Sequence, residues 1–337
     1  MSLSPRRRKT LYVAVGTIST LLVLGACAMF RGPTFAGARG VTQSLSHGGR
    51  ARSYELYRPA SLTPQSQPGL ILALHGAGGT GRGMEGLTLG KLNRIADRDG
   101  YIVVYPDGVN KRWNDLRPRD DNHVDTSVDD IGFLIALIDE LSARFNIDPS
   151  RVYVTGASNG GFMSFALVCA SPDRFAAFAP VMAGIGTLVA EHCALSTPRA
   201  PAVSLLMING TRDPLVPYDG TSVTFRERHL GNKLTVPATI STWASWLGCP
   251  SAPTTTTLPN TDPDDGTWVT QTNHVGCRDQ SEISLITVDG GGHTWPGGHP
   301  YLPERTIGKT SRDVDASELI AAFFSRHRRS RSPSAAP

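Results

Sequence analysis

Short apolar runs alternate with longer amphipathic segments along most of the chain. Continuous or nearly continuous apolar runs are typical of strands that are buried on both faces of a sheet. They occupy residues 69–74, 101–105, 151–155, 175–180, 205–209 and 282–288, and an alternating strand begins at residues 54–57. Helix-like segments occupy residues 84–96, 127–141, 161–168 and 314–325. Strands that alternate with helices predict an α/β fold with a mainly parallel central sheet and right-handed crossovers.

One globular domain accounts for this pattern. The chain has 337 residues, 40% of them hydrophobic, which is enough for a large core, and no internal repeat is evident. We expect the domain to span residues 51–326, with the Thr- and Pro-rich segment 253–265 as an excursion from it. The net charge is +4, and basic runs near both ends indicate a targeting signal and a solvated, disordered tail at 327–337. No nucleic-acid-reading motif accompanies these runs, so no nucleic-acid partner is expected.

The first 27 residues have the pattern of an export signal. A positive cluster at 6–9 precedes an apolar stretch at 11–26, and Leu24-Gly25-Ala26-Cys27 is similar to a bacterial lipobox. In a lipobox the cysteine is lipidated, so Cys27 is the expected anchor to the outer face of a membrane. Cleavage without lipidation, or retention of the segment as a short anchor, is the alternative. Residues 28–50 are Gly-, Ala- and Arg-rich and aperiodic, and we expect them to form a flexible tether.

Export predicts an oxidising compartment, in which cysteines form disulfides. Setting Cys27 aside leaves Cys169, Cys193, Cys249 and Cys277. Four cysteines allow three pairings, and the sequence does not choose among them. We expect Cys169–Cys193 and Cys249–Cys277, since each of these pairs closes a local loop. Four buried free thiols are the alternative.

Residues 151–168 read as a strand, then Gly156-Ala157-Ser158-Asn159-Gly160, then a helix. G-x-S-x-G at a sharp strand-to-helix turn is typical of a nucleophile elbow, which holds the serine hydroxyl above the sheet. The flanking residues must be small because the backbone segments crowd there. An ordinary glycine-rich turn has the same pattern, so Ser158 needs a histidine and an acid to become a nucleophile.

Two later loops contain those partners, in the chain order that an elbow serine requires. Asp213 follows the apolar run 205–209, and His293 follows the run 282–288. Each lies just past the carboxyl end of a predicted strand, the edge where sites form in open α/β sheets. We expect His293 to accept the Ser158 proton and Asp213 to orient the imidazole. Either residue taken alone would be an ordinary loop residue.

A glycine-rich loop, His75-Gly76-Ala77-Gly78-Gly79, follows the run 69–74. In a protein with a nucleophile elbow, such a loop supplies one backbone N–H of the oxyanion hole. We expect Asn159 and Ala77 to be the two donors, with Gly76 as the alternative to Ala77. We expect His75 to be a packed structural residue. The loop lacks the Gly-Lys-Ser/Thr ending of a phosphate-binding loop.

Other residues give weaker signals. Trp113 and Trp295 follow strands on the predicted active edge, so they are candidates for lining the substrate pocket, with ordinary loop packing as the alternative. Asp129 and Asp130 fit a helix N-terminus better than a catalytic role. No Cys/His spacing predicts a zinc site, and we expect neither a metal nor a cofactor.

These motifs together resemble the secreted polyhydroxybutyrate depolymerase and feruloyl esterase family of α/β-hydrolases, and more narrowly its actinobacterial lipoprotein esterases. The resemblance covers roughly residues 52–325. It rests on the motifs LHGAGG (74–79), YPDG (105–108), WN (113–114), DDIGF (129–133), GASNGG (156–161), DRFAA (173–177), NGTRD (209–213) and GHTWPGG (292–298).

The resemblance implies an α/β-hydrolase fold and hydrolysis of carboxylic esters outside the cytoplasm, with Ser158, Asp213 and His293 as the triad and no cofactor. Hydroxyalkanoate oligomers, feruloyl or acetyl groups, and small aryl or alkyl esters are the substrate classes implied. The cysteine placement of the family agrees with the two pairings above. A serine peptidase of the same fold, or a surface-tethered binding module with an inactive site, is the alternative.

Overall fold

The computed structural model describes residues 35–118, 124–197, 200, 202–225, 228–250 and 252–329. The predicted export signal, Cys27 and residues 330–337 lie outside the described residues. Within the described ranges, no helix is both long enough and apolar enough to cross a membrane.

Strands run over Val41–His47 (β1), Arg50–Tyr57 (β2), Gly69–Leu74 (β3), Tyr101–Pro106 (β4), Val152–Ala157 (β5), Ala177–Val181 (β6), Ser204–Gly210 (β7), Ser222–Phe225 (β8), Arg228–Asn232 (β9), Thr254–Thr257 (β10), Trp268–His274 (β11) and Ile283–Asp289 (β12). Helices run over Gly81–Leu87 (α2), Lys91–Asp99 (α3), Asp130–Phe145 (α4), Asn159–Ala170 (α5), Thr187–Glu191 (α6), Val236–Leu247 (α7), Glu304–Ile307 (α8) and Ala316–Ser325 (α9).

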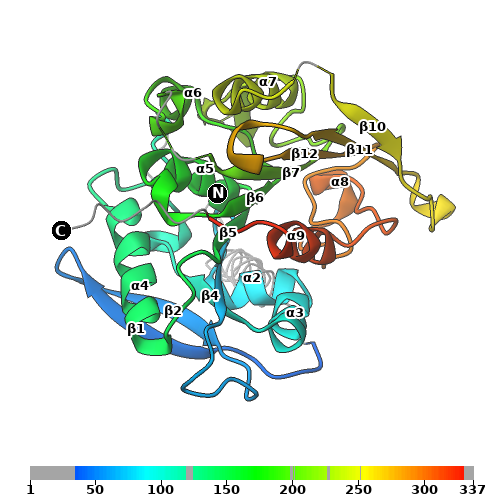
Figure 1. The fold of residues 1–337 in the computed structure, drawn as a ribbon. Coiled ribbons are helices and arrows are strands. Elements are labelled where there is room, and N and C mark those ends of the chain that lie inside the picture. Colours follow the sequence, from blue (N-terminus) through cyan, green and yellow to red (C-terminus); the bar gives the residue numbers. More distant parts are fainter. Residues whose placement is uncertain are drawn as a thin grey trace, which may run out of the picture.

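Ten of these strands form one sheet in the order β1-β2-β4-β3-β5-β6-β7-β12-β11-β10 (Figure 1). The six central strands, from β4 to β12, are parallel, while both ends of the sheet are antiparallel. The predicted strands belong to this sheet, and the fold is that of an α/β-hydrolase. The carboxyl ends of β5, β7 and β12 therefore lie at one edge, within a few strand spacings of each other.

Helices cover both faces of the sheet, and alternate residues of each strand enter different cores. On β5, Val152 and Val154 belong to the core beneath α4, α5 and α7. Tyr153, between them, belongs to the core beneath α2, α3 and α9. Figure 1 shows these two helical layers on opposite sides of the sheet. Burial on both faces explains why the central strands are continuously apolar.

The segment 84–96, expected to be one helix, is two helices, α2 and α3. The chain turns between them at Leu89 and Gly90, which have φ angles of 54° and 65°. The Phe35 ring occupies the space beside Gly90, and a Cβ there would lie 2.2 Å from it. A residue far earlier in the chain thus packs against the break between the two helices, a contact that the local apolar spacing does not reveal.

Residues 28–50 were expected to form a flexible tether, but their second half contains β1, which pairs with β2 along its full length. The residues just before β1 are also fixed to the domain. Gly40 N donates to the buried carboxylate of Glu85 at 2.7 Å, and Asn93 Nδ2 donates to Ala38 O at 3.0 Å. The sequence did not indicate β1 because this edge strand is largely polar and exposed, as edge strands often are.

Residues 327–337 were expected to form a disordered tail, but residues 327–329 pack against the domain. His327 is buried, and its ring pairs with Phe323 O at 2.7 Å. Tyr153 Oη donates to His327 O at 2.7 Å, and Arg329 N donates to Ser150 O at 2.9 Å. These bonds attach the chain after α9 to the beginning of β5, so the domain extends to at least residue 329.

Three further parts of the fold were not predicted from the sequence: α7, the β8–β9 hairpin and the β10–β11 hairpin. Strand β10 lies within the segment 253–265, which was expected to be an excursion from the domain, and the hairpin β10–β11 extends the sheet at its far end. Helix α7 has detectable signals, namely the capping residue Thr235, Pro237 in the first turn, and apolar residues at 236, 240, 243 and 247.

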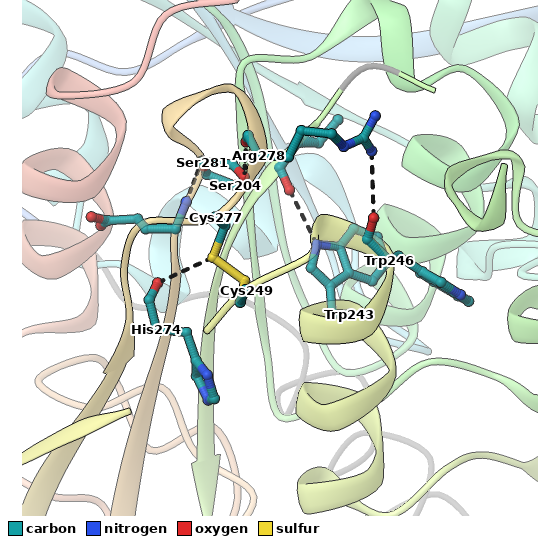
Figure 2. The surroundings of a disulfide bond; sticks show 10 residues. Ser204, Trp243, Trp246, Cys249, His274, Cys277, Arg278 and Ser281 are labelled. Carbon is teal, nitrogen blue, oxygen red and sulfur yellow. Dashed lines mark hydrogen bonds between the residues drawn. A yellow bond between two sulfur atoms is a disulfide. The ribbon is translucent and has the colours of Figure 1, made fainter. Parts of the chain in front are cut away.

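The cysteines are joined in the two expected pairs. Cys169, near the end of α5, bonds to Cys193 in the loop after α6. Cys249 bonds to Cys277, which ties the end of α7 to the turn between β11 and β12 (Figure 2). Arg278 supports the second bond, since its guanidinium donates to Ala200 O and Trp246 O. This disulfide fixes the start of β12, the strand that leads to His293.

Removal of the first disulfide should destabilise the domain. The bond closes a loop of sequence separation 24, and a loop of that size is worth about 3 kcal/mol in the chain-entropy account. We expect the variant Cys169→Ala/Cys193→Ala to lose about 3 kcal/mol of unfolding free energy, measured by urea denaturation. Peptide mapping without reduction should recover both pairs in the native protein, and any other pairing contradicts the assignment.

Candidate active site

Ser158 stands at a strained turn between β5 and α5, with φ 53° and ψ −116°. This conformation is rare for a residue with a side chain, and it is typical of a nucleophile elbow. The turn closes so tightly that a Cβ on Gly156 would lie 2.4 Å from Gly160 O. A Cβ on Gly160 would lie 2.2 Å from Leu74 O and 2.7 Å from His75 O. The two glycines of the motif are therefore required by close backbone contacts.

The glycine-rich loop after β3 lies directly against the elbow. A Cβ on Gly76 would lie 3.5 Å from Ser158 Cβ and 3.4 Å from Ala157 O. Within the described residues, the backbone N–H groups of Ala77 and Asn159 have no hydrogen-bond acceptor. The Asn159 amide belongs to the first turn of α5, where the helix geometry leaves amides unpaired and the helix dipole favours negative charge.

His75 holds this loop in place as a neutral residue. Its Nε2 accepts a hydrogen bond from Gly108 N at 3.0 Å, and its Nδ1 donates to Gly76 O at 2.8 Å. Burial lowers the pKa of His75 to about 4, against the raising effect of the Gly76 carbonyl and Asp107. The bonds and burial match the structural role expected for His75, and they fix Gly76 next to Ser158.

The side chain of Asn159 joins the elbow to a second loop. Its Oδ1 accepts from Trp113 N at 2.8 Å, and its Nδ2 donates to Trp113 O at 3.1 Å and to Asp115 Oδ2 at 2.7 Å. Asp115 also pairs with Arg117 at 2.7 Å. The Arg117 guanidinium lies over the ring of Phe162, 3.4 Å from its centroid.

Phe162 N donates to Ser158 O at 2.9 Å, so Phe162 lies in the first turn of α5 after the elbow. Phe162 also belongs to a small apolar cluster with Val216 of the segment after β7 and Val223 of β8. The sequence did not indicate this cluster. The position of Arg117 over Phe162 depends on tertiary packing, which leaves no signal in the local sequence.

His293 and Asp213 form a buried pair at the same edge of the sheet. His293 Nδ1 and Asp213 Oδ2 are 2.6 Å apart, and the side chains are 3% and 0% exposed. The other carboxylate oxygen, Asp213 Oδ1, accepts from Leu215 N and Val216 N at 2.8 Å each. The carboxylate is thereby held in one orientation, which leaves Nε2 of His293 as the ring atom that can exchange a proton with a neighbour.

Trp113 and Trp295 were expected to line the substrate pocket, but both are buried in the structure. Trp113 is 0% exposed and its indole N–H donates to His75 O at 2.9 Å. Trp295 is 1% exposed and its indole N–H donates to Ser317 Oγ at 3.2 Å. Both side chains pack inside the protein, so neither presents a surface to a substrate.

Asp129 and Asp130 lie at the start of α4, as expected. Asp129 caps the helix by accepting from Gly132 N, and Asp130 pairs with Arg52 and accepts from Asn114 N. In the part of the chain that the structure describes, no group of three or more His, Cys, Asp or Glu side chains is arranged to hold a metal ion.

Several known proteins share sequence with this chain. NocK of Nocardia uniformis subsp. tsuyamanensis, which is named as an esterase, is 33% identical over 291 residues, covering 82% of this chain and 80% of its own. Feruloyl esterase C of Emericella nidulans is 29% identical over 237 residues, covering 68% and 81%. Poly(3-hydroxyalkanoate) depolymerase C of Paucimonas lemoignei is 28% identical over 174 residues, covering 49% and 41%.

Two further comparisons bear on the fold. The model of the prolyl oligopeptidase family of peptidases matches residues 94–199, which contain the elbow. The solved structure of an acetyl xylan esterase from Aspergillus awamori is 21% identical, with a TM-score of 0.52, and the match covers 76% of this chain and 94% of that one. At this identity, the likeness to the solved structure concerns the fold alone.

The contact at Gly160 predicts that even a methyl group there disrupts the elbow. Gly160→Ala should abolish activity or folding, because its Cβ would meet two carbonyl oxygens of the β3 loop. Gly83→Ala is the control, since its Cβ would meet nothing closer than Thr80 Oγ1 at 3.4 Å. Circular dichroism and ester hydrolysis measure both effects. A folded, fully active Gly160→Ala variant would show that the crowding is not rigid.

Neutral His75 predicts a loss of stability in mild acid. The unfolded chain binds this proton near pH 6.5 but the folded protein only near pH 4, so stability falls as the pH drops through that interval. The loss should reach about 3 kcal/mol. Comparing unfolding free energies of the wild type and His75→Gln at several pH values isolates the effect. The variant should be less stable at neutral pH, and its curve should be flatter. Parallel curves would contradict the assignment.

Proposed function

The chain belongs to the polyhydroxybutyrate depolymerase and feruloyl esterase family of α/β-hydrolases, and we propose that Ser158, His293 and Asp213 are its catalytic triad. The protein is a carboxylic ester hydrolase. The observation that carries the triad is the buried pair of His293 Nδ1 and Asp213 Oδ2, 2.6 Å apart. It lies at the same sheet edge as the strained elbow that presents Ser158.

In the first half of the reaction, Ser158 Oγ attacks the ester carbonyl carbon while His293 Nε2 takes the hydroxyl proton. Asp213 stabilises the imidazolium that forms. The oxyanion receives hydrogen bonds from the backbone N–H groups of Asn159 and Ala77, which have no acceptor within the described residues. One such donor typically contributes about 10²–10³ in turnover. The imidazolium then gives its proton to the alcohol oxygen, the ester C–O bond breaks, and an acyl-enzyme remains.

In the second half, water attacks the acyl-enzyme and His293 takes a proton from that water. The tetrahedral intermediate collapses, Ser158 recovers its proton, and the carboxylic acid leaves. One ester and one water give one acid and one alcohol. Backbone N–H groups stabilise the charge on the substrate oxyanion, and Asp213 stabilises the charge on His293, so we propose that the reaction needs neither a metal nor a cofactor.

We propose that the enzyme acts outside the cytoplasm. The two disulfides support this location, since such bonds persist in oxidising compartments. The proposed anchor is Cys27, with a secreted form as the alternative. The substrate classes proposed are hydroxyalkanoate oligomers, feruloyl or acetyl esters, and small aryl or alkyl esters, in line with the names of the relatives.

Peptide hydrolysis is the second candidate function, because the prolyl oligopeptidase family model matches residues 94–199. The same triad chemistry cleaves esters and amides. Ester hydrolysis is favoured because the relative named as an esterase matches 82% of this chain, whereas the peptidase family model matches only residues 94–199. Peptidyl p-nitroanilides, assayed beside p-nitrophenyl esters, separate the two functions.

Hydrolysis of a p-nitrophenyl ester series, from acetate to octanoate with a feruloyl ester added, tests the proposal. We expect the wild type to cleave members of the series. Ser158→Ala should lower kcat by about 10⁴-fold or more, and Asp213→Asn by a similar order, because each removes one element of the triad. The chain-length profile then reports the size of the acyl site.

Ser171→Ala is the matched control, since Ser171 caps the opposite end of α5 from Ser158. It should keep activity within a few-fold of the wild type. An active Ser158→Ala enzyme would reject the proposed nucleophile. A folded wild type that cleaves peptidyl anilides and no ester would favour the peptidase, and one that cleaves neither would favour a binding module.

A further inference from the structure

A lysine is fully buried at the edge of the sheet where the proposed triad lies. Lys233, just after β9, is 0% exposed. Its Nζ donates to Gly220 O at 2.7 Å and to Leu234 O at 3.1 Å. Within the described residues, no carboxylate makes a direct ion pair with this nitrogen. Burying an ammonium group without a paired anion costs free energy, so a lysine at this position is expected to have a role that offsets this cost.

The backbone around Lys233 connects two loops of the active edge. Lys233 N donates to Thr221 O at 2.8 Å, at the end of the segment that begins with Asp213. On its other side, Leu234 N donates to Ile185 O at 2.9 Å, in the loop after β6. A Cβ on Gly184 would lie 3.2 Å from Lys233 Cδ, so the lysine stem fills the space beside that glycine.

The charges that act on Lys233 include the triad acid. Burial is the largest influence and lowers the pKa of Lys233 to about 8. Asp213 and Asp219 oppose this effect, with Asp213 the larger of the two, and Arg117 reinforces it. The ammonium and the Asp213 carboxylate are thus coupled through a weakly polarisable interior, where charge interactions are stronger than in water.

We propose that Lys233 is a positioning residue of this hydrolase, whose buried ammonium holds the acid-bearing segment 213–221 in place and stabilises Asp213 as the carboxylate that orients His293. The inference rests on the proposed triad. It differs from an ordinary structural role in one respect. A lysine that only fills space would leave the pH profile of activity unchanged, whereas a charge that acts on the triad acid changes that profile.

Lys233→Met removes the charge and keeps most of the stem. We expect the acid limb of the kcat/KM profile to move to higher pH by about half a unit or more, because a positive charge that acts on the triad acid is then lost. We expect kcat to fall more than KM rises, since Asp213 and His293 act on the reacting atoms and not on substrate binding. The assay uses p-nitrophenyl butyrate, quenched and read at alkaline pH.

Two control variants separate charge from packing. Lys233→Arg keeps the charge and should leave the acid limb near its wild-type position, whatever its effect on thermal stability. Thr239→Val changes a buried neighbour that lies against the same Gly184 and bonds to Thr235 O. It should lower the melting temperature without moving the acid limb. Lys233→Met with an unmoved acid limb would overturn the proposal and leave Lys233 as a packing residue.

A second measurement does not depend on folding of the Lys233 variants or on turnover. The chain has five lysines, so ¹³C labelling at Cε gives few signals to assign. One lysine should titrate near pH 8 in the wild type. Because coupling between two sites is reciprocal, Asp213→Asn should move that titration to lower pH. An unchanged titration would overturn the proposed coupling. Loss of ester hydrolysis in Ser158→Ala tests the proposed triad separately. Failure of the triad proposal can therefore be distinguished from failure of the proposed role of Lys233.

Discussion

The close backbone contact between the start of α5 and the loop after β3 is the constraint on which the site depends. Gly160 has no room for a side chain because Leu74 O and His75 O occupy that space. The same contact brings Gly76 against Ser158 and aligns an unpaired helix amide with the loop. Close-packed backbone cannot relax during a reaction, which is what a preorganised oxyanion site requires.

Buried polar side chains extend this rigid core outward, each with defined partners. Neutral His75 fixes the β3 loop, and Asn159 fixes the loop that carries Trp113. Asp213 is oriented by two backbone amides before it meets His293, and Lys233 closes the far end of the acid-bearing segment. Buried polar groups with defined hydrogen-bond partners favour one geometry, because an alternative geometry would leave them unpaired in a dry interior.

Local sequence patterns predicted the centre of this fold better than its margins. Central strands such as β3 are continuously apolar because helices cover both faces, and that pattern is visible in any window of the sequence. The edge strands β1 and β10 are polar and exposed, and they are strands only because a neighbour pairs with them. Trp113 and Trp295 were expected to line a pocket, but both are buried. A large indole ring with a hydrogen-bonded N–H group fits a core position as well as a pocket, so the residue type does not decide between them.

The sequence by itself determined the elbow, the order of serine, acid and histidine, and the alternation of strands and helices. These features are local, because the steric limits of a turn and the apolar pattern of a buried strand depend on residues that are neighbours in the sequence. Only the tertiary structure decided what meets at the edge of the sheet: Asp213 with His293, Arg117 with Phe162, and Lys233 with the acid-bearing segment. Such contacts join residues far apart in the chain, and their cost or benefit depends on burial, which no local pattern specifies.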